Sequence, residues 1–106
     1  MLSLKELIVH RAIEWGNDPK AMLALARCES TFRQFKDGEV LRGLINPLDV
    51  GLYQINEGYH LADAIRLGYD IHTLEGNTAY ANWLVKRQGY KPWNSSNHCH
   101  QLLSTV

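Results

Sequence analysis

Glu29 is the side chain whose position most suggests acid–base chemistry. Met22, Leu25 and Ala26 recur at helical spacing along an apolar stripe, and Glu29 occupies the next position on that stripe. Burial against apolar groups penalises the charged form of a carboxyl and raises its pKa, which a proton donor near neutral pH requires. A solvated carboxylate at a helix end explains the position equally well. Position alone therefore leaves both interpretations open.

Asp49 is a second carboxylate, and it comes directly before the compact segment 50–56 (VGLYQIN). Two carboxylates on opposite sides of a sugar linkage are the usual equipment for glycoside hydrolysis, one as acid and the other as nucleophile or base. The alternative is turn chemistry, because residues 46–49 (Asn-Pro-Leu-Asp) form an acceptable turn sequence. Taken by itself, Asp49 fits the turn better.

The two cysteines, Cys28 and Cys99, are too few for a zinc site built on cysteine alone. They form one disulfide or remain two free thiols. A metal site made of residues 98–100 (His-Cys-His) with His60 and Cys28 is a weaker interpretation, because adjacent ligand residues point in different directions. We expect no metal and no cofactor.

Helical periodicity and capping signals predict four helices that would position these residues. Asp18 followed by Pro19 is a strong start signal for the second of them, and in the third we expect Leu61, Ala64 and Ile65 to face inward. The period disappears from Ser30 to Asn56, which predicts a loop or a small irregular hairpin, and the tail from Pro92 onward looks irregular. The expected helices are about Leu4 to Trp15, from Pro19 to near Glu29, about Glu57 to Leu67, and about Leu74 to Gln88.

Length and composition predict one soluble domain covering residues 1–106, with 45% hydrophobic and 21% charged residues. Eleven basic residues balance eleven acidic ones, so no whole-molecule field attracts nucleic acid or an anionic membrane. No apolar run approaches the roughly 18 residues of a membrane span, and the N-terminus lacks the layout of a signal peptide. We expect a monomer without membrane insertion, from which a secretion signal could have been removed.

Two segments in this order resemble a known family. Residues 26–32 (ARCESTF) resemble the catalytic helix end of soluble lytic transglycosylases and lysozymes, and residues 51–56 (GLYQIN) resemble their second motif, which lines the glycan cleft. Residues 77–84 (NTAYANWL) are similar to a later helix of the family, and residues 89–96 (GYKPWNSS) to the ending of small bacterial members. The resemblance covers roughly residues 19 to 99.

The resemblance implies a lysozyme-like fold of the mainly α (α+β) class, in which the long connection or hairpin helps to form a glycan cleft. It also implies cleavage of the β-1,4 bond between N-acetylmuramic acid and N-acetylglucosamine in peptidoglycan, in the periplasm or outside the cell. The closer similarity is to lytic transglycosylases, which leave 1,6-anhydro products. The alternatives are muramidase hydrolysis and a non-catalytic peptidoglycan-binding module.

Site roles follow from the same resemblance. Glu29 would be the general acid and base and Ser30 would help to orient it, while Gln54 and Asn56 would contact the sugar or shape the cleft floor. The order Asp, one residue, Gly, two residues, Gln also resembles animal-type lysozymes, in which that Asp (Asp49 here) is the second carboxylate. A bond from Cys28 to Cys99 would hold the tail near the catalytic helix end.

Aromatic side chains are candidates for stacking on sugar rings, because an aromatic face covers the apolar side of a pyranose. Tyr59 is the better candidate because it follows the second motif closely. For Tyr80, as for most aromatics at helical spacing, a place in the core is the commoner outcome. Tyr90 and Trp93 are further candidates near the end of the chain.

Overall fold

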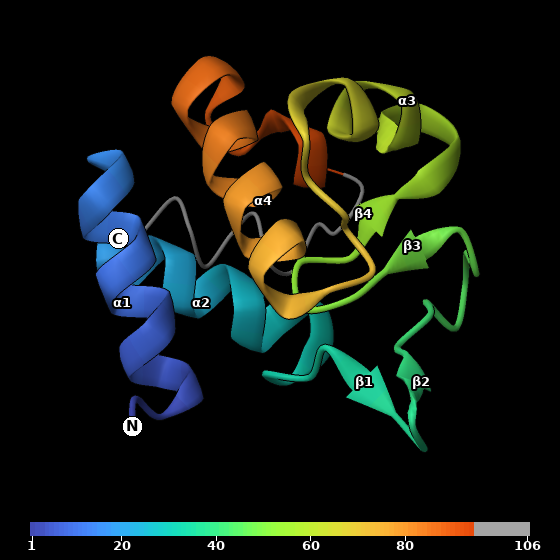
Figure 1. Ribbon diagram of the computed structural model, residues 1–106, viewed down its shortest axis with the longest axis horizontal. Coiled ribbons are helices and arrows are strands. Elements are labelled where there is room, and N and C mark those ends of the chain that lie inside the picture. The colour runs from blue at the N-terminus through green and yellow to red at the C-terminus, as the bar shows by residue number, and fades with distance from the viewer. Residues whose placement is uncertain (95–106) are drawn as a thin grey trace.

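The computed structural model describes residues 1–94, which form four α-helices and two small antiparallel β-sheets (Figure 1). All four predicted helices are present, and their ends agree with the sequence signals that predicted them. The elements are α1 (Leu4–Trp15), α2 (Pro19–Ser30), β1 (Phe35–Lys36), β2 (Glu39–Val40), β3 (Asp49–Val50), β4 (Ile55–Asn56), α3 (Glu57–Leu67), α4 (Leu74–Gln88) and the 3₁₀ turn η1 (Lys91–Trp93). The protein is therefore mainly helical, with a minor β component.

Local capping explains where the helices begin. Ser3 and Glu6 form a capping box at the start of α1, in which each side chain accepts a hydrogen bond from the backbone N–H of the other residue. At the start of α2, the Asp18 carboxylate accepts from the Lys20 N–H, and Pro19 occupies the first helical position. Both sets of contacts lie within one helical turn; the start signal at Asp18 and Pro19 was predicted from the sequence, and the capping box at Ser3 was not.

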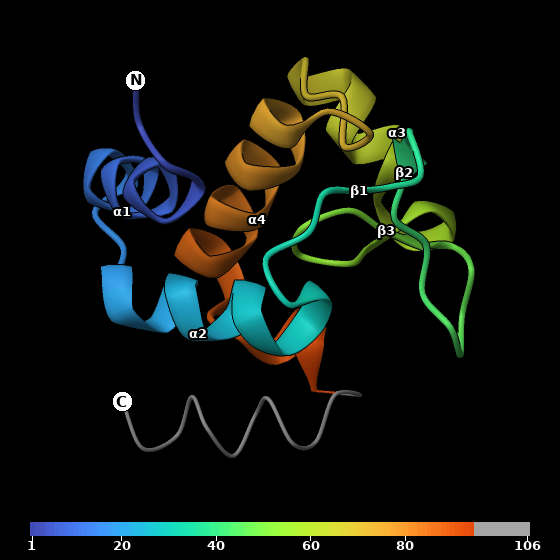
Figure 2. The ribbon, with the colours of Figure 1, turned by 90° about the horizontal axis from the view of Figure 1, so that it is seen from below.

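Helix α4 runs through the middle of the molecule, with α1 on one side and the strands and α3 on the other (Figures 1 and 2). Helix α2 crosses beneath α4 in the second view and packs against α1. A single hydrophobic core joins these elements. Its fully buried members include Ile8, Ala12, Met22, Leu25, Ala26, Val50, Leu52, Tyr53, Ala64, Ile71, Tyr80 and Ala81.

The connection from α2 to α3 contains two short hairpins. A small hairpin was one of the two alternatives predicted for this region, and a loop was the other. Strand β1 pairs with β2, and Asp49 of β3 pairs with Asn56 of β4. An isolated bridge between Arg42 and Val50 ties the two hairpins together. The connection is thus an ordered β region whose second hairpin is partly buried.

Two expectations need correction, and a third concerns residues outside those that the structure describes. Ile65 does not face the core but is 66% exposed, because the buried stripe of α3 runs through Leu61, Ala64 and Leu67. The tail that we expected to be irregular starts at Pro92, which lies in the 3₁₀ turn η1; the tail beyond Asn94 lies outside the described residues. No cysteine within residues 1–94 is free, whereas Cys99 and its neighbouring histidines lie outside the described residues, so the Cys28–Cys99 bond stays a prediction.

No helix of residues 1–94 is long and apolar enough to cross a bilayer.

Gly76 in the first turn of α4 is required by a close backbone approach. A Cβ built at this position would lie 1.9 Å from the Asp70 carbonyl oxygen, and that backbone cannot swing away as a side chain would. We expect Gly76→Ala to lower the free energy of unfolding by about 2 kcal/mol through overpacking. Urea unfolding of the two proteins would measure the loss. Gly38→Ala is the comparison. Gly38 has open space around its α-carbon but a positive φ, so alanine there adds backbone strain without a close contact.

Candidate functional site

A cleft of about 630 Å³ lies where the end of α2, the second hairpin, the start of α3 and η1 meet. Six of the residues predicted for a glycan site line this cleft: Glu29, Asp49, Gln54, Asn56, Tyr59 and Trp93. They come from six different elements or turns, between positions 29 and 93 of the sequence. The fold therefore brings together two carboxylates, two amides and two aromatic rings.

Glu29 is half-buried at the last turn of α2, next to the point where the chain reverses. Thr31 and Phe32 follow with positive φ angles of 54° and 60°, and the Thr31 N–H closes the helix by donating to Arg27 O. This reversal ends the helix just after Glu29 and leaves its side chain in the cleft wall. Buried apolar side chains, Ile55 and Trp93, line the same cleft.

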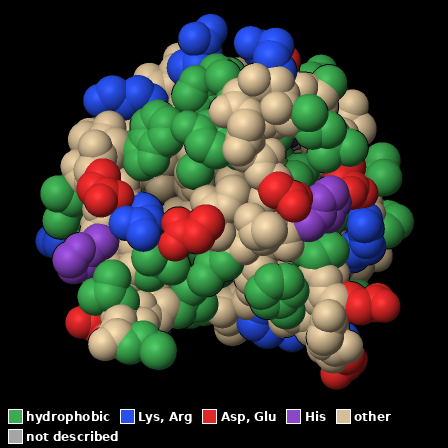
Figure 3. Space-filling view, viewed as in Figure 1, with side chains coloured by type: hydrophobic (Ala, Val, Ile, Leu, Met, Phe, Trp, Pro, Cys, Tyr) green, Lys and Arg blue, Asp and Glu red, His purple; other side chains and the backbone are tan. Residues whose placement is uncertain are grey.

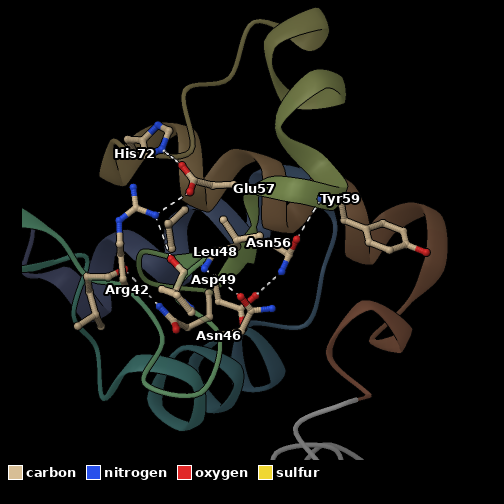
Figure 4. Close-up of polar contacts among 12 residues, drawn as sticks. Arg42, Asn46, Leu48, Asp49, Asn56, Glu57, Tyr59 and His72 are labelled. Carbon is tan, nitrogen blue, oxygen red and sulfur yellow. Dashed lines mark hydrogen bonds and ion pairs between the residues drawn. The ribbon is translucent and has the colours of Figure 1, made fainter.

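Asp49 is held by the strand pairing of the second hairpin. Asn56 is its partner across the sheet, and the Asn56 Nδ2 donates to Asp49 Oδ1 over 2.9 Å (Figure 4). The Asn56 Oδ1 meanwhile accepts from the Tyr59 N–H and caps α3. Asn56 thus fixes the Asp49 carboxylate and the first turn of α3 at the same time.

Gln54 belongs to a tight turn of residues 51–54 that other buried amides hold in place. Its φ is +51°, and its Nε2 donates to Gly51 O over 3.0 Å. Gly51 has a φ of +77°, and a Cβ there would lie 2.4 Å from the Asn77 Nδ2. The glycine of this motif is needed because Asn77 packs directly against it.

Trp93 closes the cleft from the η1 side and is 4% exposed. Its indole Nε1 donates to Tyr53 O over 2.8 Å, so the ring anchors η1 to the same 51–54 turn. His60, Gln88 and Lys91 also line the cleft, although the sequence did not single them out for this site. The sequence had named His60 only in the weaker metal-site interpretation, and its position next to Tyr59 was the signal that could have placed it here.

Ser30 and Tyr80 are predicted site residues that do not line the cleft. The buried Ser30 hydroxyl donates to Ala26 O and accepts from the Arg33 N–H, so it shapes the helix end. Tyr80 is fully buried, its ring stacks on Trp83, and burial raises its pKa to about 12. Its hydroxyl lies 3.0 Å from the Nδ1 of His60, so it supports a cleft residue from behind.

An ionic cluster supports the outer wall of the cleft (Figure 4). Arg42 donates to the Glu57 carboxylate over 2.6 Å and to Pro47 O over 3.0 Å, and the Glu57 N–H donates to Leu48 O. The other Glu57 oxygen contacts His72 Nε2. The cluster therefore ties the loop 42–48, which carries the cleft residues Ile45 and Asn46, to α3 and to the segment before α4.

Glu57 and His72 stabilise each other's charged forms, so their pKa values shift in opposite directions. Hydrogen bonds from Arg42 and then His72 hold the pKa of Glu57 below its usual value, and the Glu57 carboxylate raises the pKa of His72. The His72 contribution is complete below pH 6.5 and is lost as pH rises through its raised pKa. The Glu57 contribution is complete above pH 4.5 and is lost as pH falls through its lowered pKa. The cluster is strongest between these limits.

We expect His72→Gln to destabilise the protein by about 0.5 kcal/mol near pH 5.5, a small value because His72 is solvent-accessible. The loss should shrink toward pH 8, where the parent histidine becomes neutral. Thermal unfolding at the two pH values would measure it. In a Glu57→Gln background the same substitution should lose most of its pH dependence, and the remainder comes from Asp70, whose carboxylate also contacts His72. A loss in the parent background that is equal at both pH values would contradict the coupling.

Comparison with known proteins found no counterpart for this arrangement: no protein-family model, no curated protein and no solved structure matches the chain.

Proposed function

We propose that this chain is a lysozyme-like enzyme that cleaves the β-1,4 bond between N-acetylmuramic acid and N-acetylglucosamine in peptidoglycan. The observation that carries the proposal is the meeting of Glu29 and Asp49 in one cleft, with the amides of Gln54 and Asn56 beside them. A volume of about 630 Å³ is within the range of sites that enclose part of a small ligand or polymer. The substrate places the protein's activity in the cell envelope.

Glu29 would act as the proton donor. It is half-buried, and the apolar side chains of Ile55 and Trp93 line the same cleft. In the proposed reaction the Glu29 proton passes to the glycosidic oxygen as the bond to the anomeric carbon breaks. An oxocarbenium-like centre then develops on the muramic sugar.

Binding groups surround this acid. Amide side chains such as Gln54 donate and accept hydrogen bonds, which suits the hydroxyl and N-acetyl groups of amino sugars. Tyr59 is 85% exposed, so its ring is available to cover the apolar face of a pyranose. Lys91 is a cation that lines the same cleft as the two carboxylates.

The oxocarbenium-like sugar can react in two ways. In a lytic transglycosylase, the 6-hydroxyl of the same sugar attacks the anomeric carbon and gives its proton to Glu29, which leaves a 1,6-anhydro product. In a muramidase, water attacks with help from Asp49. The hydrogen bond from Asn56 keeps the Asp49 carboxylate in a fixed position, which is the feature that favours this second candidate. We favour the transglycosylase because of the motif resemblance.

Digestion of purified peptidoglycan followed by mass spectrometry of the products tests the proposal. Anhydro-ended fragments would establish the transglycosylase, and fragments with reducing ends would establish the muramidase. A protein that releases no fragments but sediments with the sacculi would instead be a non-catalytic binding module. Release of peptides with intact glycan strands would contradict the proposal.

A further inference from the structure

A second pocket, of about 570 Å³, lies between α3 and α4 and continues the cleft. We call it the α3–α4 pocket. Tyr59, His60 and Gln88 line both the cleft and this pocket. A substrate strand that follows the cleft toward α3 therefore places its attached groups at the α3–α4 pocket.

Charged side chains at this pocket are mainly cationic. Among residues 1–94, Arg66 of α3 and Arg87 of α4 line it, together with one carboxylate, Asp63. Lys and Arg side chains gather along the upper edge of the face in Figure 3, over the C-terminal end of α4. Arg66 pairs with Asp63 over 3.0 Å, but both side chains are more than half exposed, at 65% and 52%, so the pair is weak. The pocket keeps an excess of positive charge.

Arg87 is held in a way that suits ligand binding. Its guanidinium carbon lies 4.9 Å from the centre of the Trp83 ring, and Trp83 in turn stacks on the buried Tyr80. This cation–π contact with the indole face restricts where the guanidinium lies. Within residues 1–94, no carboxylate pairs with Arg87. A planar guanidinium fixed in this way is suited to bind a carboxylate through two parallel hydrogen bonds.

Resting on the proposed function, we propose that the α3–α4 pocket binds a carboxylate of the peptide that the muramic sugars of peptidoglycan carry. The N-acetylated sugar rings of such a strand are uncharged, and the lactyl carboxyl is consumed in the bond to the peptide. The peptide is therefore the part of the strand that carries negative charge. Arg87 is the principal ligand of this carboxylate, and Arg66 is the second, after exchange of its contact with Asp63.

The test compares two forms of one soluble peptidoglycan preparation. In both, the amines are acetylated; in one, the peptide carboxylates are then converted to methylamides, which removes their charge and leaves the glycan unchanged. We expect the parent protein to lose about tenfold in kcat/KM on the methylamide form, mainly through KM, because charge-assisted hydrogen bonds are lost.

Variants of the pocket arginines test whether this fall in kcat/KM arises at the α3–α4 pocket. Arg87→Ala should lower kcat/KM about tenfold on the carboxylate form and leave the methylamide form nearly unchanged. Arg66→Ala should do the same to a smaller extent. Lys86→Ala is the matched control, since Lys86 is an exposed cation on the same helix that lines neither pocket, and it should behave as the parent on both substrates.

The possible failures are separable. Equal cleavage of both substrate forms by the parent overturns the inference and leaves the proposed function standing. An equal loss on both forms for Arg87→Ala also overturns it, because the pocket would then bind neutral sugar. A parent protein that cleaves neither form overturns the proposed function, and the inference with it.

Discussion

Glu29→Gln should abolish most of the peptidoglycan-cleaving activity, with a fall of about 10²- to 10⁴-fold in rate, the usual contribution of a general acid. Glutamine keeps the shape and the hydrogen-bonding oxygen of the side chain but has no proton to give to the glycosidic oxygen. The leaving group would then have to depart as an alkoxide. Release of soluble fragments from purified sacculi, followed over time, measures the loss.

The fold should survive this change, because the size of the side chain and its place at the end of α2 are preserved. An unchanged unfolding midpoint would verify that the effect is chemical. Glu39→Gln is the matched control, since Glu39 is an exposed carboxylate on β2 that does not line the cleft, and it should retain full activity. Full activity of Glu29→Gln would overturn the assignment of the acid.

Asp49→Asn extends the same experiment to the choice between the two reactions. In a transglycosylase the attacking hydroxyl belongs to the substrate, so this variant should keep most of its activity and still release anhydro products. In a muramidase its activity should fall with that of Glu29→Gln. Asparagine can still pair with Asn56, so the hairpin should remain intact. The product ends and the remaining rate together decide between the reactions.

Asn77→Ala should cause the largest loss of stability, about 4 kcal/mol. Asn77 is fully buried on α4, its Oδ1 accepts from the Tyr53 N–H, and its Nδ2 donates to Val50 O and Ile71 O. Alanine would remove this partner from all three backbone groups, of which Ile71 O keeps the Gln34 Nε2 donor. Each group left unsatisfied costs about 1 to 3 kcal/mol, and the smaller side chain adds a small cavity.

Urea unfolding would give the size of this loss, and hydrogen exchange at the Tyr53 amide would locate it. That amide should exchange much faster in the variant, because the 51–54 turn loses its support. Asn82→Ala is the comparison, since Asn82 is a buried amide on the same helix that contacts Asn17 and Thr78 instead of the turn. A loss below about 1 kcal/mol for Asn77→Ala would contradict the proposed support of the turn.

The Asn77 amide also gives the physical reason for the glycine in the segment 51–56, which the sequence alone did not show. Residues 77–84 resembled a later helix of the family that begins with Asn, but its partners lie 24 and 27 positions earlier, at Tyr53 and Val50. Gly51 must lack a side chain because the Asn77 amide occupies that space. The glycine and the asparagine form one structural unit that is visible only after α4 packs against the turn.

The sequence by itself determined the helices and the position of the candidate acid. Interactions within about four residues decide where a helix begins and ends, as at Ser3 with Glu6 and at Asp18 with Pro19. The apolar stripe of α2, which passes through Leu25 to Glu29, is equally local. For that reason the ends of all four helices could be predicted.

Only the tertiary structure decided which side chains share a cleft. Asp49 is placed by its pairing with Asn56, and Trp93 by its bond to the Tyr53 carbonyl forty positions away. Exposure of Ile65 depends on how α3 packs, because the side of this helix that meets the core runs through Leu61, Ala64 and Leu67. These outcomes follow from packing between elements distant in sequence, and local periodicity carries no information about that packing.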